Sequence, residues 1–196
     1  MYQQRIVIVG AGIVGLLTAY TLLKQGMQNV TVLEQAAIDH PKGTSHGLSR
    51  LLRFEYGNDL LYSDMVRLSL MRWQSLEHLA KRTLYTRTGL FVLGNENDNF
   101  TLPSYHVLSE LGLSPERLSR RYCNQLFPQF DTHEYDLFTY NRDAGILHAS
   151  SCLHTLKELI IELGGNIFED HCVKDFSHEN LLRPIRLHLA SGDDIQ

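Results

Sequence analysis

The sequence predicts an α/β fold built on a parallel β-sheet, and three observations near the N-terminus support this prediction. A run of branched residues, Ile6–Val9, is typical of a parallel strand that is buried on both faces. Three glycines follow it, and after them come apolar residues at the spacing of a helix that ends near Gly26. A second branched run, Val30–Leu33, completes a unit of strand, turn, helix and strand.

The three glycines, Gly10, Gly12 and Gly15, have the spacing of a dinucleotide-binding turn. The first permits a tight turn, the second lets the backbone approach a pyrophosphate, and the third lets the helix pack closely on the strand. Free N–H groups near Ile13 would face the phosphates, because a helix N-terminus favours negative charge by roughly 0.3–1 kcal/mol. Glu34, which ends the second strand, is placed to accept both ribose hydroxyls. We therefore predict a nucleotide site, and the alternative is an ordinary βαβ turn.

The composition excludes several classes of protein. With 196 residues, 43% of them hydrophobic, the chain is long enough for one or two globular domains. A net charge of −4 and a pI of about 6.2 leave no general basic surface, so we expect no nucleic-acid partner. The three cysteines are far apart, which suggests reduced thiols rather than disulfides. Threonines and glycines in residues 6–23 argue against a signal peptide or membrane span, so we expect a cytoplasmic protein without a membrane partner.

A second motif, TSHGLSRLLR, follows a segment of loop composition. His46, Arg50 and Arg53 are four and three residues apart, so we expect them to share one face of a helix that begins near His46. Two cations and an imidazole would then converge. The alternative is a solvated helical face whose arginines lie near Glu55 and Asp59.

The two motifs together resemble the flavoprotein amine and amino-acid oxidases, particularly the monomeric sarcosine oxidase branch. The stretches that carry the resemblance are GAGIVGLLTAYTLLKQG with VTVLEQ, and TSHGLSRLLR. It implies FAD as the cofactor, with the positions of an SHG-x-[ST]-R-x-x-R segment at His46, Ser49, Arg50 and Arg53 lying against the flavin ring. By this resemblance Arg50 and His46 stabilise the reduced flavin, whereas Arg53 binds a substrate carboxylate.

These observations predict two sets of site residues and no metal ligand. The predicted catalytic residues are His46, Arg50 and Arg53. The predicted cofactor-binding residues are Gly10, Gly12, Ile13, Val14, Gly15, Glu34, Gln35, His46, Ser49, Arg50 and Val173. Val173 is included through the resemblance, which places its backbone against the adenine. Cys152 and His154 are two residues apart on a predicted helix and so face apart, which favours structural roles over metal binding.

The resemblance implies oxidation of the C–N bond of a small amine or N-methyl amino acid, with dioxygen as oxidant and peroxide as product. It covers only about the first half of a family member, so we expect an unpaired sheet edge, an exposed apolar surface and a possible complementing C-terminal half. The alternative is a truncated or split nucleotide-binding fragment without oxidase activity. An NAD-dependent dehydrogenase would fit the first unit but would not explain TSHGLSRLLR.

The predicted fold is thus a Rossmann-like FAD-binding domain interleaved with the start of an α+β substrate domain. The predicted domains are residues 1–85 and 141–196 for FAD, the latter incomplete at its C-terminus, and 86–140 for a partial substrate domain. The remaining predicted helices are residues 64–81 with Trp73 and the methionines in the core, 103–113, a stretch within 114–127, and one after Gly145 that buries Leu163. The remaining predicted strands are residues 90–93, 135–140 and a hairpin of 173–176 with 185–189, followed by the start of another strand.

Overall fold

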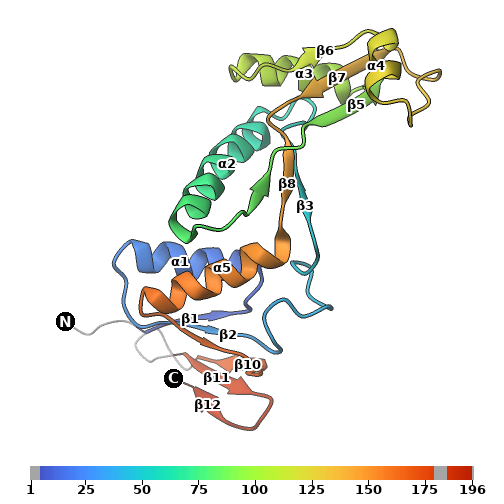
Figure 1. The fold of residues 1–196 in the computed structure, drawn as a ribbon. Coiled ribbons are helices and arrows are strands. Elements are labelled where there is room, and N and C mark those ends of the chain that lie inside the picture. The colour runs from blue at the N-terminus through green and yellow to red at the C-terminus, as the bar shows by residue number, and fades with distance from the viewer. Residues whose placement is uncertain (1–4, 179–184, 196) are drawn as a thin grey trace. The chain divides into compact units, whose positions relative to one another are not determined.

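The computed structural model describes residues 5–178 and 185–195, which form two compact units (Figure 1). The first unit combines Met1–Leu48 with Ala149–Gln196, and the second is the intervening segment Ser49–His148. The chain therefore leaves the first unit after Leu48 and returns to it at Ala149. The mixture of helices and parallel strands confirms the predicted α/β class.

The first unit is built on a parallel sheet of three strands in the order β1-β2-β9. Ile6 lies opposite Val30, and Thr31 lies opposite Asn166. All residues of the central strand are buried, as expected for branched residues covered on both faces. The elements are β1 (Ile6–Val9), α1 (Ile13–Lys24), β2 (Val30–Leu33), α5 (Ala149–Glu162) and β9 (Asn166–Phe168).

Helices α1 and α5 pack on each other, and each also contacts the parallel sheet (Figure 1). The buried residues of this core include Leu16 and Ala19 of α1 and Leu153, Leu156 and Ile160 of α5. The prediction that Leu163 is also buried was wrong, since it is 41% exposed. Gly165, by contrast, packs closely against the core, since a Cβ there would lie 2.7 Å from the side chain of Leu23 and 2.8 Å from that of Ile160.

A second, antiparallel sheet completes the first unit. It consists of β10 (Val173–Ser177), β11 (Arg186–Leu189) and β12 (Asp194–Ile195). These strands confirm the predicted hairpin and the strand predicted to follow it. Much of the predicted connection, residues 179–184, lies outside the described residues.

The second unit contains two antiparallel sheets of three strands each, in the orders β3-β8-β4 and β5-β7-β6. Its strands are β3 (Arg50–Leu52), β4 (Tyr85–Thr86), β5 (Leu90–Gly94), β6 (Glu116–Arg117), β7 (Leu137–Asn141) and β8 (Gly145–Leu147). Its helices are α2 (Leu60–Ala80), α3 (Thr101–Glu110) and α4 (Arg120–Leu126). Helix α4 is shorter than the predicted helical stretch, because Ser119 caps its start by accepting the N–H of Tyr122.

Helix α2 confirms one part of its prediction and corrects another. Trp73 and Leu76 are buried as expected, but Met65 and Met71 are 51% and 55% exposed. Met65, Leu68 and Met71, three residues apart, form an exposed apolar stripe, whereas Trp73 and Leu76 are buried. The methionines therefore belong to an exposed apolar face and not to the core.

The two compact units divide the chain at other positions than the predicted domains. Strand β3 and helix α2 belong to the second unit, since β3 pairs with β8 and α2 contacts α3 and β4. The domain bounds 1–85, 86–140 and 141–196 stay a prediction about functional domains. Among the described residues, none of the helices has both the length and the apolar character that a membrane-spanning segment requires.

Candidate cofactor-binding site

The glycine turn between β1 and α1 is closed by backbone contacts. Gly10 has a φ of +98°, and its N–H donates to the carbonyl oxygen of Leu33 at 2.7 Å. A Cβ at Gly15 would lie only 2.0 Å from the carbonyl oxygen of Gly10. The turn therefore needs glycine at Gly10 for its backbone conformation and at Gly15 for the close packing of helix on strand.

Two backbone donors of this turn face side-chain oxygens that come from elsewhere in the first unit. The N–H of Ile13 donates to Ser45 Oγ at 3.0 Å, and the N–H of Ala11 donates to Glu34 Oε2 at 2.6 Å. The N-cap residue, Gly12, has no side chain that could bind them. The start of α1 is therefore a place where oxygen acceptors bind, as phosphate and ribose oxygens require.

Glu34 is held in place by the strand next to it. Its N–H donates to the carbonyl oxygen of Phe168 at 2.9 Å, and its own carbonyl oxygen accepts the N–H of His171 at 2.7 Å. Its second carboxylate oxygen, Oε1, accepts the N–H of Ala36 at 3.2 Å. The acid at the carboxyl end of β2 is thus oriented toward the turn.

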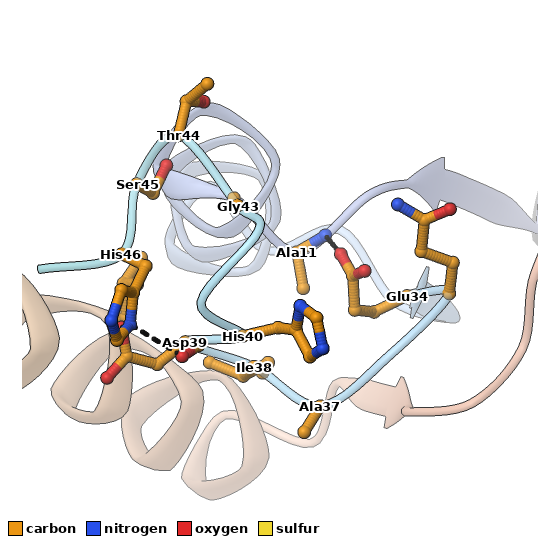
Figure 2. Close-up of a pocket in the computed structure, with 13 residues that line it drawn as sticks. Ala11, Glu34, Ala37, Ile38, Asp39, His40, Gly43, Thr44, Ser45 and His46 are labelled. Carbon is orange, nitrogen blue, oxygen red and sulfur yellow. Dashed lines mark hydrogen bonds and ion pairs between the residues drawn. The ribbon is translucent and has the colours of Figure 1, made fainter.

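A pocket lies beside the turn, and Figure 2 shows its wall. The turn contributes Ala11 and Gly12, and the end of β2 contributes Glu34 and Gln35. The rest of the lining consists of Ala37, Ile38, Asp39, His40, Gly43, Thr44, Ser45, His46 and Leu153. The structure therefore brings four predicted residues to one pocket, and these are Gly12, Glu34, Gln35 and His46.

Other predicted cofactor residues lie outside this lining. Gly10, Ile13 and Gly15 build the turn itself, and Val14 is 76% exposed in the first turn of α1. Val173 begins β10 and is not among the residues that line the pocket. Its predicted contact with adenine stays a prediction.

Two carboxylates hold the loop of residues 37–46 that forms one side of the pocket. Glu169 accepts the N–H of Ile38 at 2.6 Å and pairs with Lys157 at 2.5 Å. The hydrogen bond from Lys157, helped by the one from Ile38, lowers the pKa of Glu169 below its ordinary value. Asp39 binds the His46 ring at 2.8 Å.

The pKa of Asp39 is also lowered. Burial by itself would raise the pKa of this carboxyl group, but hydrogen bonds from Ser150 and His46, and the charges of His46 and His154, together outweigh that effect. The loop is therefore fastened by ionised groups at both Asp39 and Glu169 near neutral pH.

Sequence reasoning missed Ala11, Asp39 and Ser45, although all three line the pocket. The position of Ser45 next to His46 in the TSHG motif was a usable signal. The role of Asp39 could not be found in this way, because it depends on a left-handed backbone with a φ of +66° and on contacts with a helix more than 100 residues later in the chain.

The structure corrects the helix that we predicted from His46. Residues 50–52 form β3, with Arg50 opposite Leu147 of β8, and Gly47 has a φ of +140°, which no α-helix contains. His46 belongs to the first unit and the two arginines to the second, so the three residues share no helical face. Pairing with β8 has overridden the helical spacing.

Arg53 contacts two aromatic rings of the second unit. Its guanidinium carbon is 4.8 Å from the ring centre of Tyr56 and 5.4 Å from that of Phe100, which are distances of cation–π contacts. Tyr56 also stacks on Tyr62, with ring centres 5.6 Å apart. Arg50 is exposed, and its Nη1 donates to the carbonyl oxygen of Ser49 at 2.9 Å.

The acids that we considered as arginine partners have other roles. Asp59 caps α2 by accepting the N–H of Tyr62 at 3.0 Å. Glu55 is 4% exposed and accepts hydrogen bonds from Asn141 Nδ2 and from the N–H of Phe54, each at 3.0 Å. Burial raises the pKa of Glu55, despite the opposing effect of these hydrogen bonds and of the Arg53 charge.

Among the described residues, no group of three or more histidine, cysteine and acidic side chains is placed to hold a metal ion. Cys152 is buried, whereas the side chain of His154, on the same helix, is 51% exposed. The two therefore point to different surroundings, as their spacing predicted.

Comparison with known proteins identifies the family. A family model described as FAD dependent oxidoreductase matches residues 5–193. The chain belongs to this family. The cofactor of this family is FAD. The predictions of an FAD-binding fold and of a relationship to sarcosine and amino-acid oxidases are confirmed.

Relatives within the FAD-dependent oxidoreductases are much longer than this chain. Peroxisomal sarcosine oxidase of Mus musculus is 33% identical over 161 residues, which cover 82% of this chain and 41% of that protein. Monomeric sarcosine oxidase of Bacillus sp. (strain B-0618) is 27% identical, with 87% of this chain and 44% of that protein covered. The crystal structure of L-proline dehydrogenase from P. horikoshii shares the fold, with a TM-score of 0.81 and 21% identity over 99% of this chain and 50% of that one. The chain thus spans half or less of these relatives.

The pocket residues fit FAD. The glycine turn leaves no Cβ between the backbone and a pyrophosphate, and a side chain at Gly12 would already lie 3.3 Å from Ser45 Oγ. The N–H groups of Ala11 and Ile13 point at oxygen acceptors, and the carboxylate of Glu34 has the chemistry to accept ribose hydroxyls.

Proposed function

We propose that this chain forms the FAD-binding part of an oxidase that acts on the C–N bond of a small amine or N-methyl amino acid. The observation that carries the proposal is the glycine turn, where the N–H groups of Ala11 and Ile13 face oxygen acceptors at 2.6 and 3.0 Å. Pyrophosphate and ribose oxygens of FAD are acceptors of the same kind. Similarity to sarcosine oxidases supports the choice of a C–N bond.

The first unit would hold the ADP half of the cofactor. Backbone N–H groups at the start of α1 would bind the pyrophosphate, and Glu34 would accept the ribose hydroxyls. We assign this half to Gly10, Gly12, Ile13, Val14, Gly15, Glu34 and Gln35, with the backbone of Val173 at the adenine.

The remaining predicted residues would serve the flavin and the substrate. His46, Ser49 and Arg50 would lie at the flavin, where donors and positive charge stabilise added electrons. Arg53 would bind the substrate carboxylate through the edge of its guanidinium, while the rings of Tyr56 and Phe100 hold its faces. When bound, FAD supplies the electron acceptor for amine oxidation, and dioxygen restores it with formation of peroxide.

The length of the relatives supports a second candidate function. Because the chain spans 41% of the mouse relative and 44% of the Bacillus relative, a complete oxidase would need residues that correspond to the rest of those proteins. These residues could continue this chain or form a complementing partner. Without them, the chain would be a nucleotide-binding fragment that is not an oxidase. We place either form in the cytoplasm, which suits cysteines in the thiol form.

A titration of the purified chain with FAD tests the proposal. We expect flavin fluorescence to be quenched on binding, and a Glu34→Gln variant to bind about tenfold more weakly, because a hydrogen bond to a charged acceptor is lost. Glu110→Gln, an exposed change of the same kind, is the matched control. Absence of FAD binding by the wild-type chain would overturn the proposal.

Peroxide release separates the two candidate functions. We expect release from sarcosine when the chain is combined with a polypeptide that corresponds to the remainder of its relatives. If the chain binds FAD but releases no peroxide, either alone or in combination with that polypeptide, the result would favour the nucleotide-binding fragment.

A further inference from the structure

Asp39 binds His46 with two oxygens at once. Nδ1 of His46 lies 2.8 Å from Oδ1 of Asp39 and 2.8 Å from the backbone carbonyl oxygen of the same residue (Figure 2). A carbonyl and a carboxylate can only accept, so Nδ1 of His46 must carry the proton and donate it. The contact sets the tautomer of the neutral ring and closes the segment between the two residues into a loop whose ends meet.

The other oxygen of the Asp39 carboxylate faces helix α5. His154 Nε2 lies 3.7 Å from Oδ2, and Ser150 hydrogen bonds to the same carboxylate. Ser150 and His154 are four residues apart, so they lie on one face of α5. The carboxylate is therefore surrounded by donors from the loop and from the helix.

The end of the loop meets α5 as well. The carbonyl oxygen of Gly47 accepts the N–H of Ser150 at 3.1 Å. It also lies 3.0 Å from the Ser150 hydroxyl, whose single proton goes either to this oxygen or to the Asp39 carboxylate. The carbonyl oxygen of Leu48 accepts the N–H of Ala149 at 3.2 Å. The first residues of α5 thus receive both the Asp39 carboxylate and the backbone that follows His46.

The backbone and the burial of Asp39 agree with a specific role. Asp39 has a φ of +66°, in the left-handed region that residues other than glycine adopt rarely, with Asp and Asn among the exceptions. Its side chain is 13% exposed. Glycine would satisfy the backbone, but only a short acidic side chain also binds His46 and the start of α5.

We propose that Asp39 is a positioning residue of the cofactor site, which orients the His46 ring and ties the loop of residues 37–46 to helix α5. This inference rests on the proposed FAD site and extends it to a residue that would act through His46. The same loop carries Ser45, whose hydroxyl meets the N–H of Ile13 at 3.0 Å. Loss of the Asp39 contacts would therefore loosen the wall of the pocket on the side that faces the glycine turn.

A carboxyl NMR titration tests the pairing in the protein without added FAD. In the wild-type chain we expect the pKa of Asp39 to lie below its ordinary value. We expect it to rise in His46→Gln, which loses the contact at 2.8 Å, and to rise by less in His154→Gln, whose ring nitrogen lies 3.7 Å away. A pKa of Asp39 that is unchanged in His46→Gln would overturn the inference. A general loss of structure would be seen as shifts throughout the spectrum and would not move this one titration alone.

FAD affinity tests the consequence for the cofactor. We expect Asp39→Asn, which tolerates the left-handed backbone but removes the charge, to weaken FAD binding about tenfold. Asp170→Asn is the matched control, because Asp170 is also left-handed, with a φ of +59°, and is exposed. Equal affinity in Asp39→Asn and the wild type would contradict the positioning role. If the wild type binds no FAD, the proposed function fails, and the Asp39 titration still decides whether the carboxylate holds His46.

Discussion

At the scale of single residues, Gly15 shows how one hydrogen atom in place of a side chain decides the site. Gly15 lies in helix α1, where alanine would ordinarily be favoured by about 1 kcal/mol. The missing Cβ instead lets α1 approach β1 so closely that a methyl group would meet the carbonyl oxygen of Gly10 at 2.0 Å and the side chain of Ile8 at 3.4 Å. The glycine turn can exist only while this contact is free of a side chain.

We predict that Gly15→Ala lowers the free energy of unfolding by about 3 kcal/mol, because overpacking displaces helix or strand. Gly164→Ala is the control. It has a φ of +83° but no atom within 4 Å of an added Cβ, so strain alone should cost about 1–2 kcal/mol. Urea unfolding measures both variants. Equal losses would show that packing at Gly15 matters no more than backbone strain.

Glu55 is the residue whose charge should shape the pH dependence of the second unit. Burial raises its pKa in the folded state, so its contribution to stability is fully present below the unfolded pKa, about 4.3, and is lost as the pH rises through the folded pKa. We predict that Glu55→Gln gains stability relative to the wild type as the pH rises above the unfolded pKa of about 4.3, because only the wild type must ionise a buried acid. Urea midpoints at several pH values measure this difference. The substitution also alters hydrogen bonds, but this shifts the urea midpoint by the same amount at every pH.

Glu110→Gln is the control for this prediction, since Glu110 is exposed. Its midpoint should follow that of the wild type at every pH. A constant difference between Glu55→Gln and the wild type over this range would contradict the raised pKa.

At the scale of elements, helix α2 contains large apolar residues of two kinds: buried ones that should stabilise the fold, and exposed ones that should contribute little to stability. Trp73 is 8% exposed and Met65 is 51% exposed, although both are large and apolar. We predict that Trp73→Ala costs about 3–5 kcal/mol of unfolding free energy, whereas Met65→Lys changes it by less than about 0.5 kcal/mol. Thermal unfolding followed by circular dichroism distinguishes them. A large loss in Met65→Lys would mean that the exposed stripe contributes to the folded chain.

The elements also show what a sequence can and cannot predict. The βαβ unit was predicted almost to the residue, because its strands, glycines and helix all follow local rules that agree with one another. The segment after His46 was not, because its helical spacing competes with long-range pairing to β8, in which Arg50 lies opposite Leu147, 97 residues later. The same contrast holds for the pocket. Glu34 was predicted from its sequence distance to the glycine turn, whereas Asp39 could not be predicted because its role depends on long-range contacts.

At the scale of the whole molecule, the two units should respond differently to the cofactor. The glycine turn, Glu34 and the pocket all belong to the first unit. We predict that FAD at about 100 times its dissociation constant stabilises that unit by about 2.7 kcal/mol, which slows exchange of its most protected amides about 100-fold. Hydrogen exchange at Val32 of β2 measures this effect, and Thr139 of β7 is the internal control. Equal slowing at both amides would mean that the units unfold together, or that the bound flavin also stabilises the second unit through Ser49 and Arg50.

The pairing of β2 with β9 affects how the protein folds during its synthesis on the ribosome. Thr31 lies opposite Asn166, which is 135 residues later in the chain. The third strand of the parallel sheet is therefore synthesised long after the first two. Closing so long a loop costs roughly 2 kcal/mol more than closing one of about 16 residues, since each doubling adds about 0.6 kcal/mol. During synthesis the second unit, which is continuous, can fold while the glycine turn still lacks β9 and the helix that holds Asp39. We therefore expect the ability to bind nucleotide to emerge late on the ribosome, although the glycine turn that identifies it is translated almost first.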